Sequence, residues 1–264
     1  MYSFAYHRPS SSAEAQGLSK SADARFLAGG MTLLPAMKLR LTQPSDLIDL
    51  SRVAELKGIK AGGSEVRIGA MTPHAAVAAS AEVRKAIPAL AGLAGMIGDP
   101  QVRNRGTIGG SLANSDPAAD YPAAVIGLNA TIHTSRRTIP ADSFFKGLFE
   151  TALEPGELIT AVSFPVPERA AYEKFRHPAS RYAVVGVFVA KTAGGVRVGV
   201  TGAGPCAFRA TQFEQALSKS FSPDALKGLS VPSAGLNSDI HAGADYRAHL
   251  VAVLARRAVA AAAG

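Results

Sequence analysis

Two double-glycine segments of similar composition most constrain how this chain folds. The first is Ala-Gly-Gly-Met-Thr at residues 28–32, and the second is Thr-Ile-Gly-Gly-Ser at residues 107–111. The first lies between an expected strand and an expected helix that runs through residues 33–39. Adjacent glycines let a backbone approach a ligand closely, and a helix N-terminus adds free N–H groups. We therefore predict a pyrophosphate held from both sides, with a run of backbone donors in each segment.

Other glycine-rich segments have simpler interpretations. Gly62-Gly63 and Gly194-Gly195 are typical of hairpin turns. Residues 202–207 follow an expected strand and match the spelling G-x-G-x-x-A. A Rossmann domain would also need a helix there and a strand ending in an acidic residue ~20 residues later. The residues before Asp224 do not resemble a strand, so we interpret residues 202–207 as a turn.

The expected elements divide the chain into three parts and predict an α+β fold. Residues 1–56 alternate short strands with helices, and residues 57–165 combine hairpins with Ala-rich helices. Residues 166–264 indicate an antiparallel sheet with helices on one side. Residues 98–122 are rich in Gly, Asn and Asp, and we expect them to be irregular. Loops of that length inside a domain are usually functional or disordered, and the apolar residues here argue against disorder.

Composition excludes several classes of protein. The single cysteine, Cys206, allows no disulfide within the chain and no cysteine-ligated cluster built from it alone. The six histidines show no metal-ligand spacing, so we expect no metal site. No apolar stretch reaches the ~20 residues of a membrane span, and the first residues lack the apolar run of a signal peptide. We therefore expect a cytoplasmic protein without an integral membrane segment.

The net charge of +8 has two interpretations. It could indicate a polyanionic partner such as nucleic acid, an acidic protein or a phosphate-bearing cofactor. It could also reflect a merely basic surface, which we favour because no segment concentrates five or more Lys and Arg residues. Aromatic residues make up 6% and Trp is absent, so a base-stacking platform is poorly supported. We expect no nucleic-acid partner.

Long motifs around both glycine pairs resemble a known family. Residues 28–40 resemble the first flavin loop of the FAD-binding medium subunits of molybdenum hydroxylases, the carbon monoxide dehydrogenase/xanthine dehydrogenase family. Residues 97–113, followed by residues 116–120, resemble the second flavin loop. The resemblance covers nearly the whole chain. It implies a two-lobed, vanillyl-alcohol-oxidase-like FAD-binding domain plus a small C-terminal domain, in agreement with the three parts above.

The resemblance also implies which residues bind FAD. Asp120 matches a carboxylate that bonds cofactor hydroxyls, and Leu158 would offer backbone groups to the flavin edge. Lys174 matches a residue near the pyrimidine end of the ring, and Tyr182 an aromatic residue placed over the flavin. In the family the two glycine loops hold the pyrophosphate and the ribityl chain. The loop residues carried over are Ala28, Gly29, Gly30, Met31, Thr32, Thr107, Ile108, Gly109, Gly110 and Ser111.

The residues by themselves leave other roles open. Asp120 could cap the helix that follows it, Lys174 could be an exposed strand lysine, and Tyr182 could be a core residue with a bonded hydroxyl. The chain also departs from the family pattern, which commonly has His or Gln and then Ser after the first glycine pair. Here Met31 loses that side-chain hydrogen bond, whereas Thr32 keeps the hydroxyl.

The resemblance implies electron transfer through non-covalent FAD. A large partner subunit would carry the molybdenum cofactor, and a small one would carry two [2Fe–2S] clusters, together forming a dimer of heterotrimers. Electrons would pass from the clusters to FAD and on to an external acceptor, for which a quinone or cytochrome is favoured over NAD. We assign no catalytic residue to this chain. The substrate of the complex stays open among carbon monoxide, aldehydes and N-heterocycles.

Two other functions stay open on the sequence. A stand-alone FAD oxidase of a small alcohol would need a substrate cavity and a general base beside the flavin. A basic binding module would carry no cofactor at all.

Overall fold

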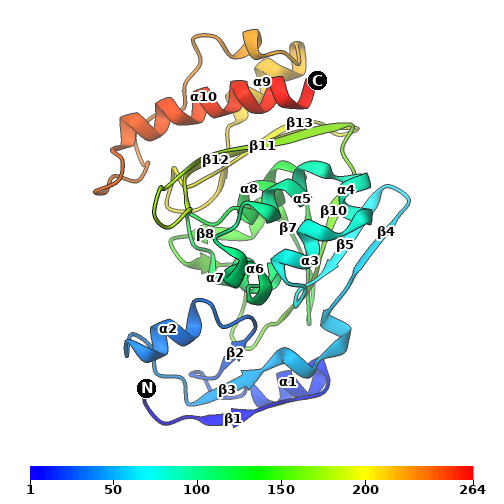
Figure 1. Cartoon of the computed structure of the whole chain (residues 1–264), viewed down its shortest axis with the longest axis vertical. Helices are drawn as coiled ribbons and strands as arrows, with labels where there is room; N and C mark the ends of the chain where they lie inside the picture. Colours follow the sequence, from blue (N-terminus) through cyan, green and yellow to red (C-terminus); the bar gives the residue numbers. More distant parts are fainter. Residues whose placement is uncertain (264) are drawn as a thin grey trace.

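A short parallel sheet organises the N-terminal part of the computed structural model, which describes residues 1–263 (Figure 1). Its central strand, β3, pairs in parallel with β1 on one side and with β2 on the other. Buried Met71 and Leu158, from the middle of the chain, complete the small core beneath this sheet. The elements of this part are β1 (Ala5–His7), α1 (Ser12–Leu18), β2 (Arg25–Leu27), α2 (Leu33–Lys38), β3 (Asp46–Asp49), and two 3-10 turns, η1 (Leu50–Arg52) and η2 (Ala54–Leu56).

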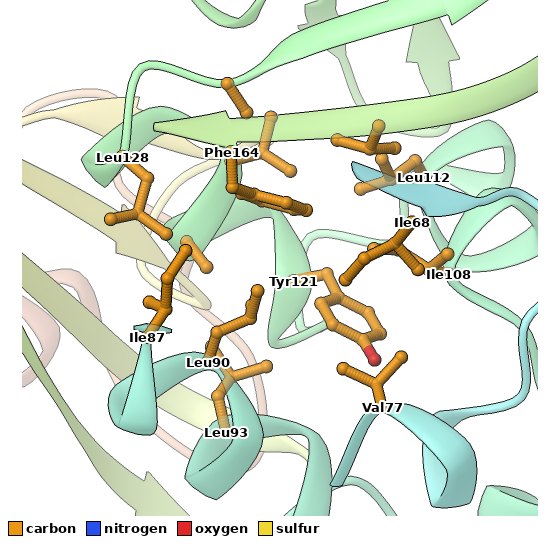
Figure 2. Packing of buried hydrophobic residues seen from close by; sticks show 14 of the residues in the cluster. Ile68, Val77, Ile87, Leu90, Leu93, Ile108, Leu112, Tyr121, Leu128 and Phe164 are labelled. Atoms are coloured by element: carbon orange, nitrogen blue, oxygen red, sulfur yellow. The ribbon is translucent and has the colours of Figure 1, made fainter. Parts of the chain in front are cut away.

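The middle part is built on a five-stranded antiparallel sheet of order β4-β5-β10-β6-β7. Helices pack on it around a large apolar core, in which Ile68, Ile108, Leu112 and Tyr121 converge (Figure 2). The elements are β4 (Ile59–Gly62), β5 (Glu65–Gly69), α3 (His74–Ala79), α4 (Ala81–Ala86), α5 (Pro88–Gly95), α6 (Pro100–Arg105), α7 (Ile108–Asn114), α8 (Tyr121–Gly127), β6 (Thr131–Thr134), β7 (Thr138–Pro140), η3 (Ala141–Ser143), β8 (Phe145–Gly147), β9 (Glu150–Thr151) and β10 (Ile159–Pro165).

Residues 98–122 are largely helical, so the expectation of an irregular stretch was wrong. The Asp99 carboxylate accepts a hydrogen bond from the N–H of Val102 at 2.8 Å and caps α6. The Thr107 hydroxyl likewise accepts from the N–H of Gly110 at 3.1 Å and caps α7. These capping bonds, together with tertiary packing, outweigh the poor helix propensity of glycine and asparagine.

The C-terminal part is the expected antiparallel sheet, of order β11-β12-β13-β14, with helices on one face. The long helix α10 covers one face, and α8 and α5 from the middle part pack on the other (Figure 1). The hairpin expected at Gly194-Gly195 joins β12 to β13. The elements are β11 (Arg169–Arg176), β12 (Ala183–Thr192), β13 (Gly195–Thr201), β14 (Phe208–Arg209), α9 (Thr211–Lys219), η4 (Pro223–Leu226) and α10 (Ala244–Ala263).

The segment with the G-x-G-x-x-A spelling is a turn, as interpreted from the sequence. Gly202 has a φ of +81°, and its N–H donates to the carbonyl of Pro117 at 2.7 Å. The buried guanidinium of Arg247 donates to the carbonyls of Gly202 and Val184 and pairs with Asp239. Arg247 thereby joins α10 to the sheet. Within residues 1–263, no helix has the length and apolar character needed to span a membrane.

Candidate functional site

A cleft of about 880 Å³ opens where the three parts of the chain meet. The N-terminal part contributes the first glycine loop, and the middle part contributes the turns around α6 and α7. The C-terminal part contributes residues 180–182, from the connection between β11 and β12. The cleft is lined by more apolar than polar surface, as expected of a site for a large organic ligand.

The first glycine loop presents unpaired backbone donors to this cleft. The backbone N–H groups of residues 29–33 donate no hydrogen bond to any backbone or side-chain acceptor within residues 1–263. Several of these groups are the free donors that any helix N-terminus has, because α2 begins at Leu33. The Thr32 hydroxyl forms no capping bond and is equally unpaired in the described part. Together these groups form a set of free hydrogen-bond donors.

The glycine pair of this loop is required mainly by protein packing. A Cβ at Gly29 would overlap the backbone carbonyl of Arg105, just before the second loop. Gly30 has a φ of +75°, a backbone conformation that residues other than glycine rarely adopt. The two loops therefore lie in direct backbone contact, which keeps the unpaired donors at a fixed place in the cleft wall.

The second glycine loop differs from the predicted run of free backbone donors. The N–H of Ile108 donates to the carbonyl of Thr72 at 3.2 Å, and that of Gly109 donates to the carbonyl of Ala70 at 2.8 Å. The N–H groups of Gly110 and Ser111 are used within the loop, both on acceptors of Thr107. This loop instead offers the Ser111 hydroxyl, which has no partner within the described residues.

Asp120 lies at the back of the cleft in a buried ionic cluster. The Lys174 ammonium lies 2.8 Å from its Oδ1, and the Tyr172 hydroxyl donates to the same oxygen at 2.6 Å. Asp120 stands at the start of α8 but forms no capping bond, and Lys174 is only 3% exposed. The helix-cap and exposed-lysine alternatives are therefore wrong. Burial raises the pKa of the Asp120 carboxyl, against the opposing effects of Lys174 and Tyr172.

Tyr182 lies at the mouth of the cleft and is 48% exposed. The core alternative for Tyr182 is therefore wrong. Its hydroxyl has no hydrogen-bond partner within the described residues, and the pKa of the hydroxyl is raised by partial burial, with Asp116 and Asp120 nearby. An aromatic ring in this position can cover a planar ligand while its hydroxyl stays in water.

Leu158 lines the cleft, but its backbone is already engaged. Its N–H donates to the Ser135 hydroxyl at 3.2 Å, and its carbonyl accepts from the Ser135 N–H at 2.8 Å. The preceding residue, Glu157, forms a two-pronged ion pair with Arg137 that lowers the pKa of the Glu157 carboxyl to about 2. The second lone pair of the Leu158 carbonyl is therefore the backbone acceptor that these hydrogen bonds leave free.

His74 lines the cleft but is not among the site residues predicted from the sequence. Its Nδ1 is buried without a hydrogen-bond partner within residues 1–263, and burial, with Arg103 nearby, lowers the pKa of the imidazole to about 4. The imidazole ring of His74 lies between Gly106 and the ring of Tyr121. A Cβ added at Gly106 would come within 2.6 Å of the His74 Nε2. The only sequence signal was its position after Thr72-Pro73, the predicted start of a helix.

The structure brings most of the predicted site residues to one cleft and leaves two outside its lining. Ile108 points into the apolar core of the middle part (Figure 2), and Lys174 lies behind Asp120. The residues that line the cleft are Ala28, Gly29, Gly30, Met31, Thr32, Thr107, Gly109, Gly110, Ser111, Asp120, Leu158 and Tyr182.

Comparison with known protein families gives a decisive match. Residues 2–167 match the family model of the FAD binding domain in molybdopterin dehydrogenase. The chain belongs to this family. The resemblance inferred from the two glycine motifs is thus confirmed, and the donor set of the first loop agrees with an FAD-binding domain of the molybdopterin dehydrogenase type.

Individual relatives extend the likeness to the C-terminal part. The medium chain of carbon monoxide dehydrogenase from Hydrogenophaga pseudoflava is 38% identical over 98% of this chain and 96% of its own length. The nicotine 6-hydroxylase medium subunit of Paenarthrobacter nicotinovorans is 38% identical over 92% of this chain and 90% of its own. These relatives are subunits of oxidoreductases.

A solved structure confirms the α+β fold. Carbon monoxide dehydrogenase from Hydrogenophaga pseudoflava, in a form that lacks the Mo-pyranopterin moiety, contains a chain that superimposes with a TM-score of 0.89. The two chains are 39% identical, and the match covers 99% of this chain and 97% of that one.

Proposed function

We propose that this chain holds FAD non-covalently in the cleft and passes electrons from a partner's [2Fe–2S] clusters to an external acceptor. The observation that carries this proposal is the row of unpaired N–H groups at residues 29–33, which opens into a cleft common to all three parts of the chain. Free backbone donors next to a helix N-terminus suit a pyrophosphate. Bound FAD supplies a group that accepts electrons singly and releases two together.

In this proposal, each part of the cleft lining contacts a different part of the cofactor. The first loop binds the pyrophosphate, with Ser111 and Thr107 facing it from the second loop. Asp120 accepts a hydrogen bond from a cofactor hydroxyl, and Leu158 contacts the flavin edge. Tyr182 covers one flavin face and limits which acceptors reach it. We propose no catalytic base and no metal ligand in the chain.

We also propose the assembly in which the chain works. Its relatives are named medium chains or medium subunits, which implies larger and smaller companions. We propose a large subunit with the molybdenum cofactor, a small subunit with two [2Fe–2S] clusters, and a cytoplasmic dimer of heterotrimers. The relatives act on substrates as different as carbon monoxide and nicotine, so likeness in this subunit does not identify the substrate.

The division of the chain into domains also stays a proposal. We propose two lobes of the FAD-binding domain, residues 1–56 and 57–165, and a C-terminal domain, residues 166–264. The separate sheets of the three parts support it. Tyr172 and Phe188 from the third part pack into the core of the second, so we expect these two parts to unfold together.

The test is to load the isolated full chain with FAD and to analyse it for flavin and metals. We expect about one FAD per chain, released into the supernatant by acid precipitation, with no stoichiometric iron or molybdenum. Flavin that stays with the acid pellet would contradict the non-covalent assignment. A chain that folds but binds no FAD would favour the cofactor-free module. Turnover of a small alcohol with oxygen by the lone chain would favour the oxidase.

A further inference from the structure

The loop that joins β11 to β12 brings residues 180–182 to the cleft mouth. The N–H of His177 donates to the carbonyl of Tyr182 at 2.8 Å, and the N–H of Arg181 donates to the carbonyl of His177 at 2.9 Å. Arg181 has a φ of +62°, a left-handed conformation that is unfavourable for a residue with a Cβ. Other contacts of the loop must therefore stabilise this shape.

The imidazole of His177 supplies such contacts. Its Nδ1 accepts hydrogen bonds from the N–H groups of Ala179 and Ser180, both at 3.2 Å. A side-chain acceptor that bonds the N–H groups two and three residues later is the pattern of an Asx turn, in which the acceptor is usually Asn or Asp. Pro178 lies at the second position of this turn, where its fixed φ is favourable. The Ser180 hydroxyl in turn accepts from the N–H of Tyr182 at 3.4 Å.

The His177 ring is also held from outside the loop. The ring of His241 packs edge-on against it, with ring centroids 4.5 Å apart and an angle of 66° between the ring planes. The N–H of His241 donates to the Asp239 carboxylate at 2.9 Å, and the same carboxylate pairs with the Arg247 guanidinium at 2.7 Å. The segment before α10 thus fixes the orientation of the ring whose Nδ1 shapes the loop.

We infer that His177 is a positioning residue whose unprotonated Nδ1 shapes the β11–β12 loop and thereby holds Tyr182 at the cleft mouth. The effect of the loop on a flavin rests on the proposed function, whereas its shape does not. In the FAD-loaded chain, loss of the Nδ1 acceptor would let Tyr182 move away and uncover one face of the flavin. His177 would therefore control access to the flavin without touching it.

This role requires a neutral ring, because a protonated imidazole donates at both nitrogens and accepts at neither. Histidine gains its proton between about pH 8 and pH 5, so acidification should release the two N–H groups and loosen the loop. The other titratable and charged side chains on the elements packed around this end of β11 and on the loop itself are His241, Asp239, Arg247, Tyr246, His249, Arg176, Arg181 and Tyr182.

The first experiment measures amide hydrogen exchange of Ala179 and Ser180 by NMR in the full-length apoprotein. The variants are His177→Leu, which has no acceptor, and His177→Asn, whose Oδ1 can accept in the same turn and does not titrate. At pH 8 we expect exchange of these two amides, relative to an unstructured peptide, to be roughly tenfold faster in His177→Leu than in the wild type. His177→Asn should keep the wild-type rate.

The pH profile separates this role from simple packing of the ring. Between pH 8 and pH 5, protection of the two amides in the wild type should fall to that of His177→Leu, whereas His177→Asn should stay protected. Circular dichroism checks the fold of each variant. If His177→Leu does not fold, the wild type and His177→Asn are still compared across this pH range. Protection that is independent of pH in the wild type, or that is lost in His177→Asn, would overturn the inference.

The second experiment measures iodide quenching of flavin fluorescence in the FAD-loaded chain. We expect the quenching constant to rise about twofold in His177→Leu at pH 8, because one flavin face is uncovered. Tyr182→Ala should raise it similarly, and adding His177→Leu to Tyr182→Ala should raise it no further. A further rise in the double variant would overturn the inference. A chain that binds no FAD but shows the expected exchange profile would overturn the proposed function and support the positioning role of His177.

Discussion

At the scale of single residues, the glycines of the two loops were predicted correctly as part of the motif, but the structure gives a different physical reason for them. Sequence reasoning assigned them to close approach of a ligand. In the structure, a Cβ at Gly29 would overlap the carbonyl of Arg105, and one at Gly109 would come within 2.5 Å of the Ala70 Cβ. The glycines are required by contacts inside the protein, and the proposed ligand donors are the N–H groups of the first loop that have no partner in the described part of the chain.

We therefore predict that Gly29→Ala separates the two loops and weakens FAD binding about tenfold or more. The added methyl group overpacks the contact between the loops, which should lower the free energy of unfolding by about 1–3 kcal/mol. Gly92→Ala is the matched control, because Gly92 lies exposed in α5 with open space around its Cα. The control should raise stability by about 0.5–1 kcal/mol and keep full FAD binding. FAD titration and urea unfolding of both variants check this. Unchanged FAD affinity in Gly29→Ala would contradict the assignment of the loop.

Tyr182 gives a second prediction at this scale. Because the side chain is 48% exposed, we expect Tyr182→Ala to change the free energy of unfolding by only about 0.5 kcal/mol and to keep FAD bound. Removing the ring should change the rate at which oxygen or a quinone reoxidises the flavin. Stopped-flow reoxidation and a melting curve, measured on the same preparation, test this. A large loss of stability with an unchanged rate would remove Tyr182 from the site.

At the scale of elements, α3 and the second loop are held together through His74. The first residue of α3 places this imidazole against Gly106 and Tyr121 in a neutral form. Its pKa of about 4 in the folded state lies below the usual histidine value of about 6.5. The unfolded state therefore binds a proton more tightly. The stabilisation is complete above about pH 6.5 and is lost as the pH falls towards 4.

We predict that His74 alone removes up to roughly 3 kcal/mol of stability between pH 6.5 and pH 4. Urea unfolding of wild type and His74→Leu at several pH values measures this. The variant should lose clearly less stability on acidification than the wild type. An identical pH dependence in the two proteins would show that the imidazole is already solvated or paired.

The helices and strands also show how much of the fold could be predicted from the sequence. The antiparallel sheet of the C-terminal part and the hairpin at Gly194-Gly195 were predicted, because β12 and β13 are rich in valine and a glycine pair marks the turn between them. The helices α6 and α7 were missed, because their stability comes from the capping side chains of Asp99 and Thr107 and from burial of Ile108. The Asp120 cluster was out of reach as well, since it joins α8 to β11 across the fold and no local pattern encodes it.

At the scale of the whole molecule, the cleft depends on all three parts of the chain. Met71 and Leu158 tie the N-terminal sheet to the middle part, and Arg247 secures α10 against the strands that lead to Tyr182. Tyr182 and Lys174, two residues predicted to belong to the flavin site, lie beyond the family-matched residues 2–167. The C-terminal part is therefore a component of the proposed flavin site.

The most direct test of the proposed function is anaerobic mixing of the FAD-loaded chain with the proposed iron–sulfur small subunit, previously reduced by dithionite and freed of excess reductant. We expect the visible absorbance of the flavin to bleach as the clusters reoxidise. Added quinone should then restore it. The matched control is the chain mixed with small alcohols alone, which should leave the flavin oxidised. A flavin that ignores the reduced small subunit but is bleached by an alcohol would contradict the proposed electron-transfer function.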